Sequence, residues 1–124
     1  MRNNPEAQAQ AAYFQILALN EKRLPRLKWI HASMNGASAS SKAAAAQRKA
    51  QGQKAGVSDI CIPIPRNGYH GAWIELKIKP NKLSDAQTEF LGAMANEGYY
   101  TATAWSLSQL IHETENYLDI ALVN

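Results

Sequence analysis

Residues 72–79, Ala-Trp-Ile-Glu-Leu-Lys-Ile-Lys, form the stretch that decides the fold of this chain. Side chains of two kinds alternate along it, which is typical of a β-strand with two different faces. The apolar face carries Ile74, Leu76 and Ile78, and the second face carries Trp73, Glu75, Lys77 and Lys79. We predict that the apolar face packs inward. The opposite face of the same strand then presents one carboxylate and two ammonium groups.

Other helix and strand signals surround this strand. Capping residues and helical spacing predict helices over residues 5–20, 41–51 and 84–96, and a last one from Ser106 or Ser108 to about Tyr117. Shorter apolar runs predict strands over residues 27–32, 57–65 and 99–105, with turns at Asn35-Gly36 and Asn67-Gly68. This order predicts an α/β fold with helices packed on a mixed central sheet.

Length and composition predict one domain spanning residues 1–124, because the chain has 124 residues and is 46% hydrophobic. The first ten residues are too polar for a signal peptide, and no apolar run approaches the roughly 20 residues of a membrane span. We therefore expect a soluble cytoplasmic protein without membrane contact. Cys61 is the only cysteine, which excludes an intramolecular disulfide and a cysteine-built zinc site.

Charge is distributed unevenly along the chain. Residues 1–56 contain nine Lys or Arg against two Glu, whereas the remaining residues contain four basic and eight acidic side chains. This distribution suggests that the basic half binds a polyanion and that the acidic half holds a cation. A solvated surface of mixed charge explains the same distribution equally well.

Two carboxylates stand out in the acidic half. Asp59 begins one predicted strand and Glu75 lies in the next, 16 positions later, with the Asn67-Gly68 turn between them. If the two strands pair as a hairpin, the carboxylates converge at one end of the sheet and can bind Mg²⁺ or Mn²⁺, which prefer oxygen ligands. Lys77 shares the Glu75 face and can offset charge on a reacting phosphate. Ordinary surface charge is the alternative, because Glu-x-Lys on a strand is common by chance.

Three motifs in this order resemble the VRR-NUC domain, a branch of the PD-(D/E)XK nuclease superfamily: Gly56-Val-Ser-Asp59, Gly68-Tyr-His-Gly-Ala-Trp-Ile-Glu75-Leu-Lys77 and Leu83-Ser-Asp-Ala-Gln87. The resemblance extends from Glu6 to the last helix. It implies a restriction-endonuclease-like core and metal-dependent cleavage of DNA phosphodiesters. It also implies that Asp59, Glu75 and the carbonyl of Leu76 bind the metal. Ser58 departs from the proline of the superfamily motif, at a position that binds no metal.

The resemblance assigns roles to two further residues. Glu6 matches a glutamate on the first helix of the family, where it reaches the metal or a metal-bound water, although an acid in the first turn also favours the helix dipole. Gln87 matches the family's glutamine on the helix after the Glu-x-Lys strand, which implies a catalytic role, yet it is also the third-position partner of Ser84 in a capping box. Both roles stay open for each residue. His70 lies between glycines in Gly-Tyr-His-Gly, which indicates a turn rather than a general base.

Basic residues on and after the second helix are the predicted phosphate contacts. Together with a lysine from the 72–79 strand they form the expected DNA-binding set, which comprises Lys42, Arg48, Lys49, Lys54 and Lys79. Such contacts position a duplex without reading its sequence, and no motif resembles a base-reading module. We therefore expect selection of DNA structure rather than of a fixed sequence. A solvated helix face is the alternative.

The resemblance also implies a biological setting. Stand-alone members of the family resemble Holliday-junction resolvases, so we expect a homodimer that cuts branched DNA, because a C2 dimer supplies two active sites to a two-fold junction. Family analogy suggests a phage-like protein in a bacterial or phage-infected cell. The alternatives are a nuclease acting on linear or flap DNA, a nucleic-acid-binding module that does not cut, and an RNA- or protein-binding partner in a larger complex.

Overall fold

The computed structural model describes residues 4–33 and 41–124. Within these residues, one sheet contains four strands in the order β1 (His31–Ala32), β2 (Ile60–Ile62), β3 (Ala72–Leu76) and β4 (Tyr100–Ala104). Strands β1, β2 and β3 pair antiparallel, whereas β4 runs parallel to β3. The prediction of a mixed central sheet is therefore confirmed.

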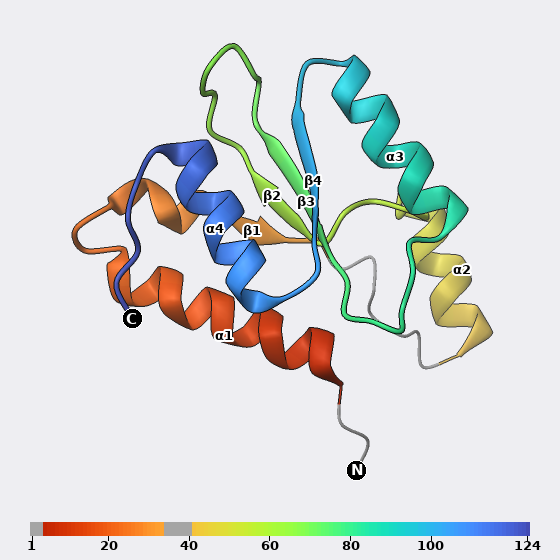
Figure 1. The fold of residues 1–124 in the computed structure, drawn as a ribbon. Helices are drawn as coiled ribbons and strands as arrows, with labels where there is room; N and C mark the ends of the chain where they lie inside the picture. Colours follow the sequence, from red (N-terminus) through yellow and green to blue (C-terminus); the bar gives the residue numbers. More distant parts are fainter. Residues whose placement is uncertain (1–3, 34–40) are drawn as a thin grey trace.

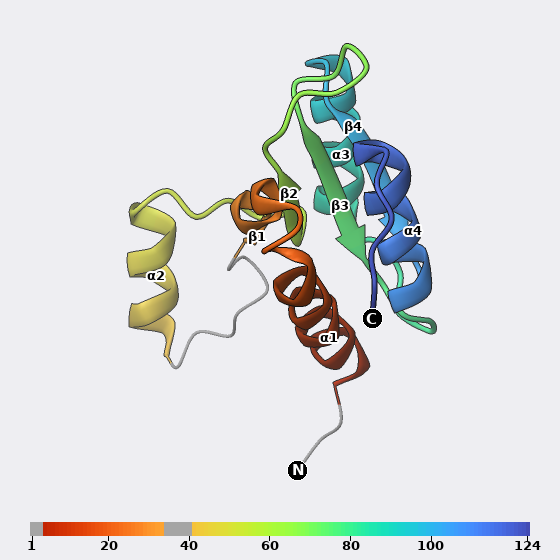
Figure 2. The ribbon, with the colours of Figure 1, turned by 90° about the vertical axis from the view of Figure 1, so that its left-hand side faces the viewer.

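Helices cover both faces of this sheet (Figure 1). Helix α3 (Asp85–Asn96) connects the parallel strands β3 and β4, as parallel neighbours require a crossover connection, and it packs on both of them. Helix α4 (Leu107–Leu118) contacts the same two strands from the other side, and α1 (Pro5–Asn20) packs against α4 (Figure 2). The predicted α/β layer architecture is confirmed.

The two faces of β3 have different neighbours. Ile74 and Leu76 are at most 1% exposed and belong to the apolar core beside Leu110 of α4, which confirms that the apolar face packs inward. The opposite face is covered by α3, because Trp73 contacts the ring of Phe90 with a centroid distance of 5.1 Å. Glu75 lies on this covered face and is only 2% exposed. The central strand is therefore buried on both sides.

Side-chain caps hold the N-terminal ends of the helices. The side chains of Asn4, Ser41 and Ser84 each accept a hydrogen bond of 3.1 Å from the backbone N–H three residues later. At the last helix the structure selects Ser106 over Ser108, since the Ser106 hydroxyl accepts from the N–H of Gln109 at 3.1 Å. The four predicted helices are present within one or two residues of their expected bounds.

One predicted strand is wrong over most of its length. Residues 25–29 form a 3₁₀ helix, η1 (Pro25–Trp29), and only His31–Ala32 of the predicted 27–32 strand pairs with the sheet. Pro25 suits the first turn of a helical segment. A 3₁₀ helix has three residues per turn, so Leu27 and Ile30 point the same way, and both are at most 5% exposed. The predicted Asn35-Gly36 turn lies outside the described residues.

The other strands are shorter than predicted. Strand β2 covers three residues of the predicted 57–65, because Pro63 and Pro65 have no N–H to give to a ladder. Strand β3 ends at Leu76 rather than at Lys79. The N–H of Ile78 donates to the Glu6 carboxylate at 3.0 Å instead of to a neighbouring strand. Strand β4 lies within the predicted 99–105.

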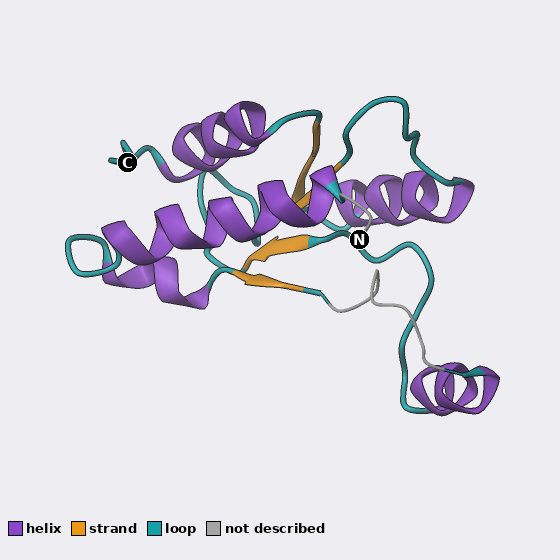
Figure 3. Ribbon diagram, turned by 90° about the horizontal axis from the view of Figure 1, so that it is seen from below, coloured by secondary structure: helices purple, strands orange, loops and turns teal. Residues whose placement is uncertain are grey.

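Helix α2 (Lys42–Ala50) stands apart from the layered body, as Figures 2 and 3 show. None of its residues is buried. Gly52, which follows the C-cap Gln51, has a φ of 105°, the left-handed conformation with which glycine commonly ends a helix. No helix within residues 4–33 and 41–124 has the length and apolar character needed to cross a membrane.

Candidate active site

The chain reaches the site through a close contact between Gly56 and helix α3. Gly56 has a φ of 88°, and a Cβ atom there would lie 2.3 Å from the carbonyl oxygen of Ala86. Only glycine fits such a left-handed position against a backbone oxygen. Ser58, two residues after Gly56, is fully buried, so the segment that leads to Asp59 is packed into the structure.

Asp59 and Glu75 come together through the register of the hairpin. Strands β2 and β3 pair with Ile60 opposite Ile74, and the two acids are the next residues beyond that pair. The backbone N–H of Leu76 donates to Asp59 Oδ2 at 2.9 Å, which ties this carboxylate to β3. The N–H of Ser33 donates to the carbonyl oxygen of Asp59 at 2.8 Å and anchors its backbone to the end of β1. The expected convergence at one end of the sheet is thus present.

Glu75 is a buried acid in an unfavourable electrostatic setting. Burial, the contact with the Asp59 carboxyl and the negative charges of Asp59 and Glu6 raise the pKa of Glu75 above its ordinary value, and the positive charge of Lys77 opposes this rise. Glu75 Oε1 is buried without any hydrogen-bond donor in the described structure. A buried acceptor in this state is costly unless a further group meets it. The carboxylate pair therefore has the character of a cation site.

Lys77 follows directly after β3, and its backbone N–H donates to the carbonyl oxygen of Ala104 at 2.9 Å. This bond continues the pairing with β4 and holds Lys77 at the end of the sheet where the carboxylates lie. Its side chain is half-buried, and its charge acts on the pKa of Glu75. The structure therefore brings together the three predicted residues Asp59, Glu75 and Lys77.

Gln87 caps helix α3 and also contacts Glu75. Its Oε1 accepts from the N–H of Ser84 at 2.8 Å, which completes the capping box of α3. Its Nε2 donates to Glu75 Oε2 at 3.3 Å. One amide thus connects the start of α3 to the buried acid, because capping fixes the orientation of the side chain.

Glu6 lies beside the carboxylate pair and bonds to protein donors. Its Oε2 accepts from the N–H of Ile78 at 3.0 Å and from Asn81 Nδ2 at 2.7 Å, which docks the start of α1 on the segment after β3. In the described parts of the chain, no three His, Cys, Asp or Glu side chains are grouped as a ready-made metal site. Two carboxylates suffice for Mg²⁺, which usually keeps several of its waters.

Comparisons with known proteins agree with this geometry. The family model of the VRR-NUC domain matches residues 4–106. The chain belongs to the VRR-NUC family. A solved structure described as a VRR_NUC domain protein is similar over 98% of this chain and 93% of that chain, with 26% sequence identity and a TM-score of 0.75. No curated protein matches the sequence at a significant level.

The part of the chain that matches the VRR-NUC family model contains the carboxylate end of the sheet. The matched region includes the site residues from Glu6 to Gln87 and all four strands. The domain is thus a nuclease domain, and a nuclease domain implies contact with DNA. The predicted recognition and fold class are both confirmed.

The predicted DNA-binding residues of this VRR-NUC domain lie in two places. Lys42, Lys49 and Lys54 are exposed on or after α2, and Arg48 of the same helix is half-buried. Lys79 is exposed on the loop between β3 and α3, two residues beyond Lys77. The set is therefore divided between a helix that stands apart and the immediate edge of the candidate active site.

Sequence reasoning missed two residues that position this VRR-NUC site. Asn81 holds Glu6, but nothing in the local sequence distinguishes it from any other loop asparagine. Gly56 opens the first of the three motifs, although its contact with Ala86 depends on tertiary packing. His70 packs beside Gly98 and against the ring of Tyr99 at 5.7 Å, which agrees with a turn that positions the strand.

Proposed function

We propose that this VRR-NUC chain is a DNA endonuclease in which Asp59 and Glu75 hold Mg²⁺ or Mn²⁺. The observation that carries the proposal is the carboxylate pair, in which Glu75 Oε1 is buried without a donor. Two adjacent carboxylates repel each other, and a divalent cation supplies the missing positive charge. The carbonyl of Leu76 is the further ligand that the family resemblance implies.

Each surrounding residue has a part in the proposed reaction. Held by Asp59 and Glu75, Mg²⁺ or Mn²⁺ would supply Lewis-acid chemistry toward the attacking water and the leaving oxygen of a phosphodiester. Lys77 offsets the negative charge that grows on the phosphate in the transition state. Gln87 orients the Glu75 carboxylate through its amide, and Glu6 holds the segment after β3 in place. Contact of Glu6 with the metal or a metal-bound water, and a catalytic role of Gln87, stay predictions.

Branched DNA is the proposed substrate, and a homodimer is the proposed active form. The described site contains one carboxylate pair, and a four-way junction needs two symmetric cuts, which a C2 dimer supplies. The basic side chains of α2 with Lys79 supply contacts to phosphates, which are independent of sequence. Light scattering at micromolar concentration, with and without junction DNA, should give twice the 13.6 kDa mass of one chain. A monomer under both conditions would remove the paired-cut model.

The test of the function compares end-labelled four-way, flap and linear DNA in Mg²⁺, in Mn²⁺ and in a chelator. We expect metal-dependent cleavage with the fastest rate on the four-way junction. Preferred cleavage of flap or linear DNA would correct the substrate while keeping the nuclease. Binding without cleavage of any substrate in either metal would support the non-cutting module instead.

A further inference from the structure

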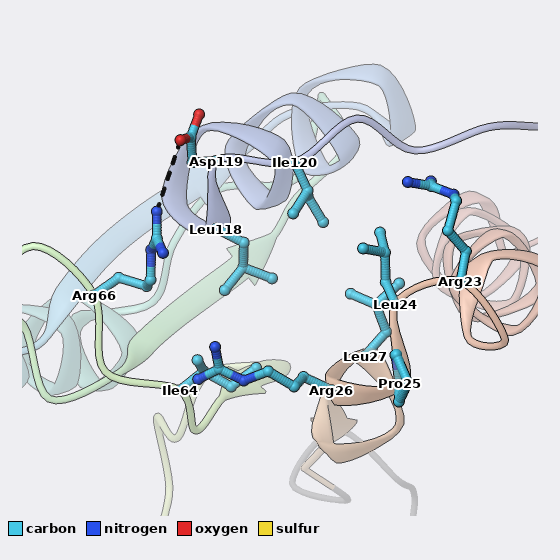
Figure 4. Close-up of a pocket in the computed structure, with 10 residues that line it drawn as sticks. All are labelled: Arg23, Leu24, Pro25, Arg26, Leu27, Ile64, Arg66, Leu118, Asp119 and Ile120. Carbon is cyan, nitrogen blue, oxygen red and sulfur yellow. Dashed lines mark ion pairs between the residues drawn. The ribbon is translucent and has the colours of Figure 1, made fainter.

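A pocket of about 330 Å³ opens at the end of the sheet opposite the carboxylate pair (Figure 4). It is lined by η1 and the residues before it, by the segment after β2 and by the end of α4. Asp59 precedes β2 whereas the pocket residues Ile64 and Arg66 follow it, so the two sites lie beyond opposite ends of this strand. The pocket volume falls at the lower end of the range for small-molecule sites.

The floor of the pocket is aliphatic. Six of the residues that line it are apolar, and none of the ten lining residues is aromatic: the apolar set is Leu24, Pro25, Leu27, Ile64, Leu118 and Ile120. Nucleobases are usually held by stacking on aromatic rings, which this lining lacks. A floor of this composition therefore suits the burial of an aliphatic group better than that of a base.

Three arginines line the same pocket, and they differ in how they are engaged. Arg23 is committed to the fold, because its Nη2 donates to Asn20 Oδ1 at 2.8 Å and to the carbonyl oxygen of Ala121 at 2.7 Å. The Arg26 side chain is exposed and makes no hydrogen bond or ion pair with any part of the chain that the structure describes. Its side chain extends from η1 toward the segment that carries Ile64 and Arg66 (Figure 4).

Arg66 is incompletely satisfied. Its Nη2 lies 3.9 Å from Asp119 Oδ2, and the Asp119 side chain is 90% exposed, so this ion pair is long and open to water. The Arg66 Nε atom is buried and has no acceptor in the described structure. A buried donor without an acceptor is uncommon. An oxyanion would supply the acceptor, because a guanidinium binds oxyanions through two parallel hydrogen bonds.

We propose that this pocket binds a small aliphatic oxyanion. The aliphatic body lies on the apolar floor, and the oxyanion lies between Arg26 and Arg66. The Arg66 side chain turns away from Asp119, and its Nε then donates to the oxyanion. With three arginines against one aspartate, the lining carries positive charge that complements the ligand. The oxyanion is a carboxylate or a monoalkyl phosphate, since a guanidinium binds both by the same geometry. This site is independent of the proposed nuclease reaction.

The test titrates the full-length protein with matched probes and follows backbone amide signals by NMR. Octanoate and octyl phosphate carry body and charge, octanol carries the body alone, and acetate and inorganic phosphate carry the charge alone. We expect shifts confined to the pocket residues, with octanoate or octyl phosphate bound at least tenfold more tightly than octanol and acetate. The ratio between octanoate and octyl phosphate identifies the oxyanion. Equal affinity for octanol and octanoate would overturn the proposal, because the arginines would then contribute nothing.

Variants separate the role of the charge from that of the fold. Arg26→Gln and Arg66→Gln should each weaken octanoate binding about tenfold and leave octanol binding unchanged, as expected for the loss of a charge-assisted hydrogen bond. Lys22→Gln changes the exposed lysine that precedes Arg23 and does not line the pocket, so it is the control and should change neither affinity. Thermal unfolding verifies that each variant is folded. Tighter binding of deoxyadenosine monophosphate than of octanoate, or displacement of octanoate by a DNA duplex, would assign the arginines to nucleic acid and overturn the proposal.

Discussion

The carboxylate end of the sheet and helix α2 differ in how far the rest of the fold buries them. Glu75 lies on a strand covered on both faces, and its neighbours Asp59 and Gln87 are fixed by hydrogen bonds to the backbone. Helix α2 has no buried residue and stands apart from the layers. An isolated helix of nine residues has little intrinsic stability, and the Ser41 cap and the alanines of α2 favour the helical conformation.

This difference corresponds to two different physical requirements. Catalytic groups must be held within a fraction of an ångström of their working positions, which only a packed core provides. Phosphate contacts depend on charge and tolerate imprecise geometry, because they act through a diffuse electrostatic attraction. We therefore expect substitutions at the carboxylate end to change rates strongly, and substitutions on α2 to change affinity moderately.

The largest effect should follow from neutralising the carboxylate pair. Glu75→Gln and Asp59→Asn keep the side-chain volume but remove anionic oxygens that we propose as metal ligands. Single-turnover cleavage should fall by about three orders of magnitude, or roughly 4 kcal/mol in activation free energy, while the fold persists. Glu97→Gln, an exposed acid after α3, should cut at the wild-type rate. Wild-type cleavage by Glu75→Gln would show that the active site lies elsewhere.

Lys77→Ala should reduce the rate less than the loss of a carboxylate does, because the metal ligands remain. We expect a decrease of about 10²-fold, or roughly 3 kcal/mol, if the ammonium stabilises the transition state. Calorimetry should still detect binding of Mn²⁺, which separates this variant from Glu75→Gln. If Lys77→Ala lost metal binding together with activity, Lys77 would be needed to assemble the site rather than to stabilise charge.

Two glycines with left-handed backbone test the rigidity of the two regions. Gly56→Ala places a Cβ against the Ala86 carbonyl oxygen, whereas Gly52→Ala after α2 meets no atom within 4 Å. Both changes carry the strain of a positive φ, so their difference isolates the close contact. We expect Gly56→Ala to lower the free energy of unfolding by roughly 2 kcal/mol more than Gly52→Ala does in urea titrations. Equal losses would mean that the Gly56 segment is free to move away from α3.

The smallest effect is expected on α2. Lys42→Glu with Lys49→Glu should weaken DNA binding about tenfold for all sequences and flatten the salt dependence by roughly two counterions. The rate of cleavage at saturating DNA should stay unchanged. Lys22→Glu with Lys28→Glu makes the same change of charge away from α2 and should weaken binding less. Equal weakening by both pairs would place the DNA across the whole basic half rather than on α2.

Sequence by itself determined the elements whose signals are local. Helix caps act over three residues, so Asn4 and Ser84 mark helix starts that the structure confirms. Alternation in β3 identified the buried face with Ile74 and Leu76, because side chains on a strand point to opposite sides. The turn between β2 and β3 made the meeting of Asp59 and Glu75 predictable, since a hairpin register follows from adjacent segments.

Tertiary structure alone decided the features that depend on distant partners. Glu6 accepts hydrogen bonds from Ile78 and Asn81, which lie 72 and 75 positions further along the chain. An acid in the first turn of a helix does not indicate such distant partners. Residues 25–29 became 3₁₀ helix rather than strand because Leu27 and Ile30 both needed burial on one side, which only the assembled core imposes. Helix α3 covers the Trp73 face of β3 and thereby buries Glu75, while an alternating pattern predicts two faces without saying what covers the second. The burial of Glu75 therefore depends on tertiary packing, because helix α3 causes it and the sequence of the strand does not specify where that helix packs.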